Sequence, residues 1–193
     1  AALQDYEAVK ERVFFLQTQY DDLIKAKETL YETIAEIDAT SAERLSDTYS
    51  KLREEFQAMF KQLFKGGNAD LELTEPENIL ESGINIVAQP PGKKPQNLLL
   101  LSGGERALTA IALLLAIRKV KPTPFVVLDE IDASLDEVNL RRFAEQMQFL
   151  AQATQFLVIT HRPGTMEVAD RLYGVTMSDH ATSQLISVQL SQE

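Results

Sequence analysis

The chain has 193 residues, 45% of them hydrophobic, with no cysteine and a formal net charge of -10. This length suits one globular domain plus an extension, and the missing cysteines exclude disulfides and thiolate metal sites. The acidic balance argues against the whole chain being a nucleic-acid clamp, and no apolar run approaches the roughly 20 residues of a membrane helix, so we expect a cytoplasmic protein with no membrane partner.

Residues 2 to 37 carry an apolar seam at alternating spacings of three and four, the heptad pattern of a coiled-coil helix. A long surface helix packed on its own domain is the alternative, but only Lys27 interrupts the register. The chain opens inside this pattern and without methionine, so we interpret it as a piece of a longer protein. We expect a coiled-coil stub over residues 1–38 and a globular lobe over residues 39–193. The seam consists of Ala2, Tyr6, Val9, Val13, Leu16, Tyr20, Leu23, Lys27, Leu30, Ile34 and Ile37.

The lobe begins with a helix and then changes to strands. Thr40 and Glu43 have the spacing of a capping box and predict a second helix, which the glycines after Lys65 end. Residues 70–74 and 83–88 are then expected as short strands.

Further along, strand and helix patterns alternate. Residues 125–128 and 156–160 are short continuous apolar runs, typical of strands buried on both faces of a parallel sheet. The sequence therefore predicts an α/β fold with a mainly parallel sheet.

Ser102-Gly103-Gly104-Glu105 stands before an apolar helix. Two residues without side chains at a helix N-terminus let an anion approach the backbone N–H groups and the helix dipole. Ser102 and Glu105 also form an ordinary capping box, so this motif alone leaves both interpretations open.

Asp129 and Glu130 end the first of the buried runs. Open parallel sheets bind ligands at the C-terminal edge of their strands. Adjacent strand residues point to opposite sides, so one carboxylate is suited to Mg²⁺ and the other to an attacking water. A solvated strand end is the alternative. Asp132, Asp136 and Glu137 follow in a loop, where Asp136 is equally suited to capping the next helix.

His161 ends the second buried run, at the same kind of strand end as the carboxylates. A lone histidine is usually a surface or satisfied core residue, and we interpret His180, which lies in a polar stretch, in that way. The convergence of three motifs on one edge of the sheet makes His161 a candidate site residue.

Taken together, these motifs resemble those of ABC-type ATPases. Residues 101–106 look like the signature, 125–130 like a Walker B strand with its catalytic glutamate, 134–136 like the D-loop, and His161 like the switch histidine. More narrowly, Asp129-Glu130-Ile131-Asp132-Ala133-Ser134-Leu135-Asp136-Glu137, Ile159-Thr160-His161-Arg162-Pro163-Gly164-Thr165-Met166-Glu167 and residues 169–177 are similar to the C-terminal half of the ATPase head of prokaryotic condensins of the SMC (structural maintenance of chromosomes) family.

The resemblance implies ATP hydrolysis between two engaged heads. Asp129 would help to hold Mg²⁺, Glu130 would orient or deprotonate the water, and His161 would contact the γ-phosphate of ATP. Ser102, Gly103 and Gly104 would close on a nucleotide bound by a second head, and Asp136 would link the two sites.

A phosphate loop is absent from the sequence. It requires Gly, four residues, then Gly-Lys followed by Ser or Thr. The only Gly-Lys pair, Gly92-Lys93, is followed by Lys94 and has Val87 where the first glycine belongs. In the resembled family the N-terminal half of the same head supplies this loop, so the chain alone is expected to be inactive.

The other partners that the resemblance implies are a second SMC head, a kleisin subunit and, through the complete complex, DNA in the nucleoid. Two alternatives remain at this point: the head of a related coiled-coil DNA-repair ATPase, and a scaffold that recruits a kleisin with inert ATPase motifs. A transporter nucleotide-binding domain would carry its own phosphate loop and no heptads.

Overall fold

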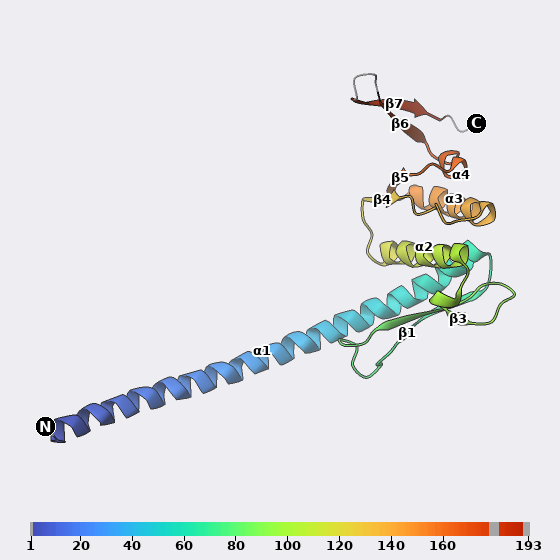
Figure 1. Cartoon of the computed structure of the whole chain (residues 1–193). Helices are drawn as coiled ribbons and strands as arrows, with labels where there is room; N and C mark the ends of the chain where they lie inside the picture. The colour runs from blue at the N-terminus through green and yellow to red at the C-terminus, as the bar shows by residue number, and fades with distance from the viewer. Residues whose placement is uncertain (1, 178–181, 191–193) are drawn as a thin grey trace. The chain divides into compact units, whose positions relative to one another are not determined.

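The computed structural model describes residues 2–177 and 182–190 (Figure 1). His180 lies outside these residues. In chain order the elements are α1 (Ala2–Phe64), β1 (Asn68–Leu73), β2 (Ile84–Gln89), β3 (Gln96–Asn97), the 3₁₀ helix η1 (Leu98–Leu100), α2 (Gly103–Val120), β4 (Phe125–Asp129), α3 (Glu137–Ala151), β5 (Gln155–Ile159), α4 (Pro163–Met166), β6 (Arg171–Met177) and β7 (Ser183–Gln189).

The predicted start of a second helix at Thr40 is wrong, because α1 runs unbroken from Ala2 to Phe64. The Thr40 hydroxyl donates a hydrogen bond of 2.9 Å to the Glu36 carbonyl oxygen inside the helix instead of capping a new one. Neither glycine nor proline occurs before Gly66. The predicted stop is confirmed: Gly67 has φ +73°, and a Cβ on it would lie 2.3 Å from the Gln89 carbonyl oxygen, so only glycine fits.

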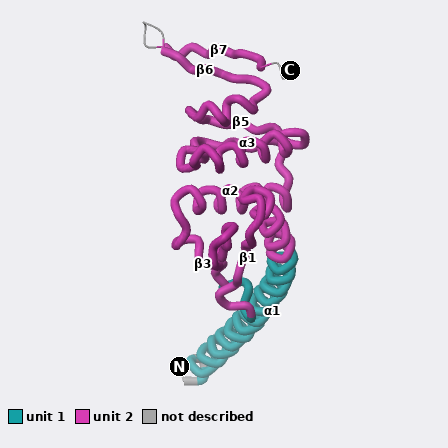
Figure 2. The backbone as a smooth tube through the Cα atoms, turned by 90° about the vertical axis from the view of Figure 1, so that its right-hand side faces the viewer, with its two compact units in different colours: residues 1–47, 77–81 teal, residues 48–76, 82–193 magenta. Residues whose placement is uncertain are grey.

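The chain forms two compact units, residues 1–47 with 77–81 and residues 48–76 with 82–193 (Figure 2). The expected boundary between a coiled-coil stub and a lobe after Asp38 stays a prediction. In the first unit the apolar seam residues from Tyr6 to Ile37 are all at least half exposed. Nothing described in this unit covers the seam. No helix of the described residues has the apolar length that crossing a bilayer requires.

The core lies in the second unit. The end of α1 contributes phenylalanines at helical spacing, and the Phe60 and Phe64 rings stack with centroids 4.1 Å apart. Arg53 also ties α1 to β1, since its guanidinium donates to both carboxylate oxygens of Asp70 at 2.5 Å. Side chains of α1, β1, α2, β4 and α3 fill this core, among them Phe56, Phe60, Leu63, Leu71, Leu108, Leu115, Leu128, Leu140 and Phe143.

The described strands form three small sheets, and only one of these sheets is parallel. Strands β1, β2 and β3 pair antiparallel, as do β6 and β7, whereas β4 and β5 pair parallel. The α/β class is confirmed, but the parallel pairing of the described strands is limited to β4 and β5.

One face of the β4–β5 pair is covered and the other is open. Leu128 is buried in the core, and Val126, Phe156 and Val158 pack against this core. Every second residue of each strand therefore faces the core, as expected from the period of two along a strand. The opposite face stays exposed although it is apolar. Phe125 is 55% exposed, Val127 54%, Leu157 46% and Ile159 55%.

Candidate functional site

Glu130 and His161 lie together at the C-terminal edge of the parallel pair. The register places Asp129 opposite Ile159, and the Glu130 N–H donates a 2.9 Å hydrogen bond to the Ile159 carbonyl oxygen. Oε1 of Glu130 then lies 4.0 Å from Nδ1 of His161. Both side chains are more than 60% exposed, so this edge is open to an incoming ligand.

The backbone of Glu130 is left-handed, with φ +48°. The expectation that Asp129 and Glu130 alternate as neighbours on a strand is therefore wrong, because β4 ends at Asp129 and Glu130 already belongs to the following turn. Left-handed non-glycine residues are uncommon and cluster at functional sites. The turn, not the strand, aims this carboxylate toward His161.

A second group of contacts surrounds the N-terminus of α2. Ser102 is the N-cap residue, and both its N–H and its hydroxyl donate to Oε2 of Glu105, at 3.2 and 2.7 Å. Nζ of Lys93 lies 2.8 Å from Oε1 of the same carboxylate. Burial opposes the charge of Glu105, but hydrogen bonds from Lys93 and Ser102 outweigh it and lower the pKa of this carboxyl. The capping-box interpretation is confirmed.

The glycines of this motif differ in their surroundings. A Cβ on Gly103 would meet nothing within 4 Å, so the backbone there is open. A Cβ on Gly104 would lie 3.5 Å from the Ser134 carbonyl oxygen and 3.7 Å from Oδ2 of Asp136. The start of α2 therefore lies against the loop before α3.

Asp136 caps α3, which confirms the second of its two sequence interpretations. Its Oδ1 accepts from the Asn139 N–H at 2.8 Å, and Oδ2 accepts from the Asn139 amide at 3.1 Å. Ser102, Glu105, Asp136, Asn139 and Arg142 line one small polar cavity of about 270 Å³. The structure thus joins Ser102 to Asp136, and Glu130 to His161, in two separate groups.

Asp132 is a residue whose importance the sequence did not reveal. It is only 1% exposed, and its Oδ2 accepts from the hydroxyls of Thr160, at 2.7 Å, and Thr165, at 2.5 Å. Its Oδ1 is buried without a hydrogen-bond partner among the described residues. Its acceptor role depends on residues far along the chain, so no local motif signals it.

Asp129 is exposed at the end of β4, with a hard oxygen ligand of the type that Mg²⁺ prefers. No group of three or more potential ligands gathers anywhere within residues 2–177 and 182–190. One carboxylate fits Mg²⁺ that is otherwise held by phosphate oxygens and water, which is a usual arrangement for this ion.

Solved head domains of SMC proteins share this fold. One, from Pyrococcus furiosus, has an extended coiled coil and is bound to the C-terminal domain of ScpA; it is 38% identical, with a TM-score of 0.74 over 96% of this chain and 46% of that one. Another, from a study of ATP-driven dimerization and DNA-stimulated activation of SMC ATPases, is 40% identical, with a TM-score of 0.69 over 74% of this chain and 86% of that one.

Sequence comparisons also match this chain to SMC proteins. The family model described as RecF/RecN/SMC N terminal domain matches residues 10–184, and the chain belongs to the SMC family. It is 56% identical to the chromosome partition protein Smc of Desulfitobacterium hafniense over 98% of this chain, and 54% identical to that of Bacillus subtilis over 99%. The chain spans 16% of the length of each of these relatives.

Proposed function

We propose that this chain is the C-terminal half of an SMC ATPase head, which hydrolyses ATP together with an N-terminal half that carries the phosphate loop. The observation that carries the proposal is the pairing of Glu130 with His161 at an open sheet edge, in a sequence without a phosphate loop. The matched family model is described by an N-terminal domain. We assign the chain to the other half because signature, carboxylates and histidine follow one another here with no Gly-Lys-Ser or Gly-Lys-Thr before them.

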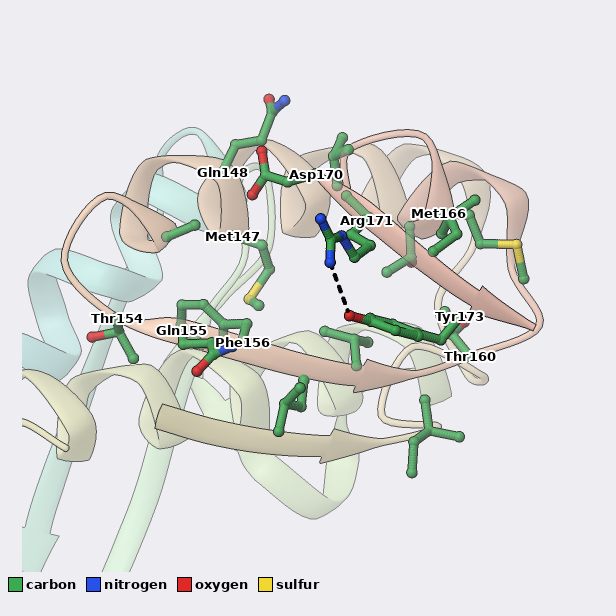
Figure 3. A pocket seen from close by; sticks show the side chains of 18 of the residues that line it. Met147, Gln148, Thr154, Gln155, Phe156, Thr160, Met166, Asp170, Arg171 and Tyr173 are labelled. Carbon is green, nitrogen blue, oxygen red and sulfur yellow. Dashed lines mark hydrogen bonds between the residues drawn. The ribbon is translucent and has the colours of Figure 1, made fainter. Parts of the chain in front are cut away.

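The open face of the β4–β5 pair supports a missing partner. Strands of parallel sheets are normally covered on both faces, but Val127 and Leu157 are about half exposed here. An open hollow of about 1660 Å³ lies beside β5, between side chains of α3 and β6 (Figure 3). The N-terminal half is proposed to cover this apolar surface. The same contact would then complete both the core and the ATP site.

The chemistry rests on placement of charge. Mg²⁺, when bound, would neutralise the phosphate oxygens, and Asp129 is the residue suited to hold it. Glu130 is placed to accept a proton from the attacking water or to orient it, with His161 beside it to contact the γ-phosphate. Phosphoryl transfer depends mainly on such positioning and charge stabilisation.

The N-terminus of α2 is proposed to act on the nucleotide of a second head. Its open Gly103 amide, the Gly104 amide and the Ser102 hydroxyl are donors suited to a phosphate. Asp136, which shares a cavity with Ser102, is proposed to connect the two sites across this interface.

The exposed seam of α1 supports an antiparallel partner helix from the N-terminal half, so residues 1–38 are proposed as the coiled-coil stub and 39–193 as the lobe. A second head, a kleisin and DNA are the proposed further partners, and the protein is proposed to organise and segregate chromosomes at the cytoplasmic nucleoid. A coiled-coil DNA-repair ATPase remains the alternative; a zinc hook rather than a hinge at the far end of the full-length protein would favour it.

Calorimetry with Mg-ATP tests the split head. The chain alone is expected to show no tight binding, because the lysine and glycines that cradle phosphates are absent. The chain purified with its N-terminal half is expected to bind ATP and to be more soluble. Micromolar binding by the chain alone would contradict the proposal, since it requires a phosphate site within these residues.

A further inference from the structure

A hydrogen-bond network around the buried Asp132 connects the turn that carries Glu130 to the turn that carries His161. Thr160 donates its hydroxyl proton to Oδ2 of Asp132. The same Thr160 oxygen accepts the Arg162 N–H at 2.9 Å. The residues on both sides of His161 are thereby bound, one through its side chain and one through its backbone.

The direction of these bonds depends on Asp132. A threonine hydroxyl has one proton to give and two lone pairs to accept with. The carboxylate accepts the hydroxyl proton and so fixes the orientation of the hydroxyl, which directs a lone pair of Thr160 toward the Arg162 N–H. The acceptor at position 132 therefore fixes the turn 160–162 at the point where His161 leaves β5.

Full burial is uncommon for an aspartate. Asp132 is 1% exposed, and its second oxygen has no partner among the described residues. Leaving a buried polar atom unpaired is unfavourable, so we look for a role of this carboxylate in the geometry of the bonds that its other oxygen accepts. Buried unsatisfied groups in native proteins call for such an explanation.

We propose that Asp132 is a positioning residue that sets His161 against Glu130, acting through Thr160. The inference rests on the proposed function, since it assigns no chemistry of its own to Asp132. Two links then join the segments: the Glu130 N–H to the Ile159 carbonyl, and Asp132 to Thr160. Glu130 takes part in the first link, and His161 follows Thr160 of the second.

Thr165 provides a matched control. Its hydroxyl donates to the same oxygen of Asp132, but it lies in α4 and does not accept the Arg162 N–H. Thr165 is 5% exposed and more buried than Thr160. A purely structural role therefore predicts that Thr165→Val is at least as harmful as Thr160→Val, whereas a positioning role predicts the reverse for turnover.

The test measures ATP turnover of the full-length protein. We expect Thr160→Val to lower kcat about tenfold more than Thr165→Val, with KM for ATP unchanged, because small misplacements of a reacting group are costly. Thr160→Ser, which keeps the hydroxyl, should restore kcat. Asp132→Asn should lower kcat without changing KM, and thermal melts identify any variant that is simply unfolded.

A double-mutant cycle separates this inference from the proposed function. If Thr160 acts through His161, Thr160→Val should cause no further loss of kcat once His161→Ala is present, because coupled residues are not additive. Additive losses, or equal losses of kcat for Thr160→Val and Thr165→Val, would overturn the positioning role. If His161→Ala and Glu130→Gln both leave turnover unchanged, the proposed function itself fails.

Discussion

Oε1 of Glu130 lies 4.0 Å from Nδ1 of His161, although the two residues follow different strands. The parallel register of β4 and β5 causes this, since it places Asp129 opposite Ile159 and brings both strand ends to one edge. Neither residue is buried, so the pair is not held for the sake of the core.

Replacing Glu130 by glutamine tests the role of the carboxylate. In the complete head we expect ATP binding to persist while turnover falls about 100-fold or more, because the amide keeps the shape but cannot accept a proton. ATP-bound dimers should accumulate, and sedimentation with saturating ATP measures them. Turnover near that of the unmodified head, or only monomers, would argue against this role.

The left-handed backbone of Glu130 allows activity and stability to be separated. Replacing a residue by glycine usually lowers the free energy of unfolding by about 0.5–1 kcal/mol. Strain at a left-handed residue costs about 1–3 kcal/mol, and glycine relieves that strain. We expect Glu130→Gly to melt at or above the temperature of the unmodified head while losing turnover. The control is Ala133→Gly. The backbone of Ala133 is not left-handed, so this variant should have a lower melting temperature than the unmodified head. Equal losses for both would show that the turn is unstrained.

Much of the fold could be predicted from local sequence. The apolar runs at 125–128 and 156–160 predicted two strands, and the bounds of β4 and β5 differ from these runs by no more than one residue at each end. The glycines after Lys65 ended α1 as expected. Thr40 misled because a threonine hydroxyl is also satisfied by the carbonyl four residues earlier, and spacing does not distinguish the two.

The sequence predicted those site residues that directly follow an apolar run. Glu130 and His161 each follow an apolar run, so the strand rule places them together. Asp132 gave no such signal, since its partners Thr160 and Thr165 reach it only through tertiary structure. The left-handed turn at Glu130 was missed for the same reason, as its N–H is bound by another strand.

Ser102→Arg tests whether the N-terminus of α2 acts on a neighbouring head. We expect loss of ATP-driven dimerisation with nucleotide affinity unchanged, because a bulky cation would occupy the interface and not the nucleotide site of its own head. Analytical ultracentrifugation and nucleotide titration measure the two properties. Ala110→Arg, which places the same charge farther along α2, is the control. Reduced ATP affinity of the monomeric Ser102 variant would mean that this motif acts within its own head.

Lys93→Met tests the contact that holds Glu105. Because hydrogen bonds from Lys93 and Ser102 lower the pKa of Glu105, this carboxyl stabilises the folded state at neutral pH and loses that contribution as the pH falls through its folded pKa. The variant should therefore raise the pKa of Glu105 and be less stable at neutral pH, with the difference vanishing in acid. Thermal melts against pH measure this. Lys94→Met, beside the contact, should show no such pH-dependent difference; an equal one would assign the effect to net charge.

The open face of β4 and β5 gives the last prediction. Val127 is 54% exposed, so a glutamate at this position is solvated in the chain alone. Its free energy of unfolding should stay within about 0.5 kcal/mol of that of the unmodified chain, as for most surface substitutions. Against the proposed N-terminal half the same carboxylate would be buried without a partner, which is strongly unfavourable. We therefore expect Val127→Glu to abolish co-purification of the two halves and, with it, ATP binding. Val138→Glu is the matched control, because Val138 is 62% exposed but belongs to α3 rather than to the β4–β5 pair, and both properties should survive there. Undiminished co-purification of the Val127 variant would mean that the N-terminal half covers some other surface, and the exposed apolar face of this sheet would then need a different partner.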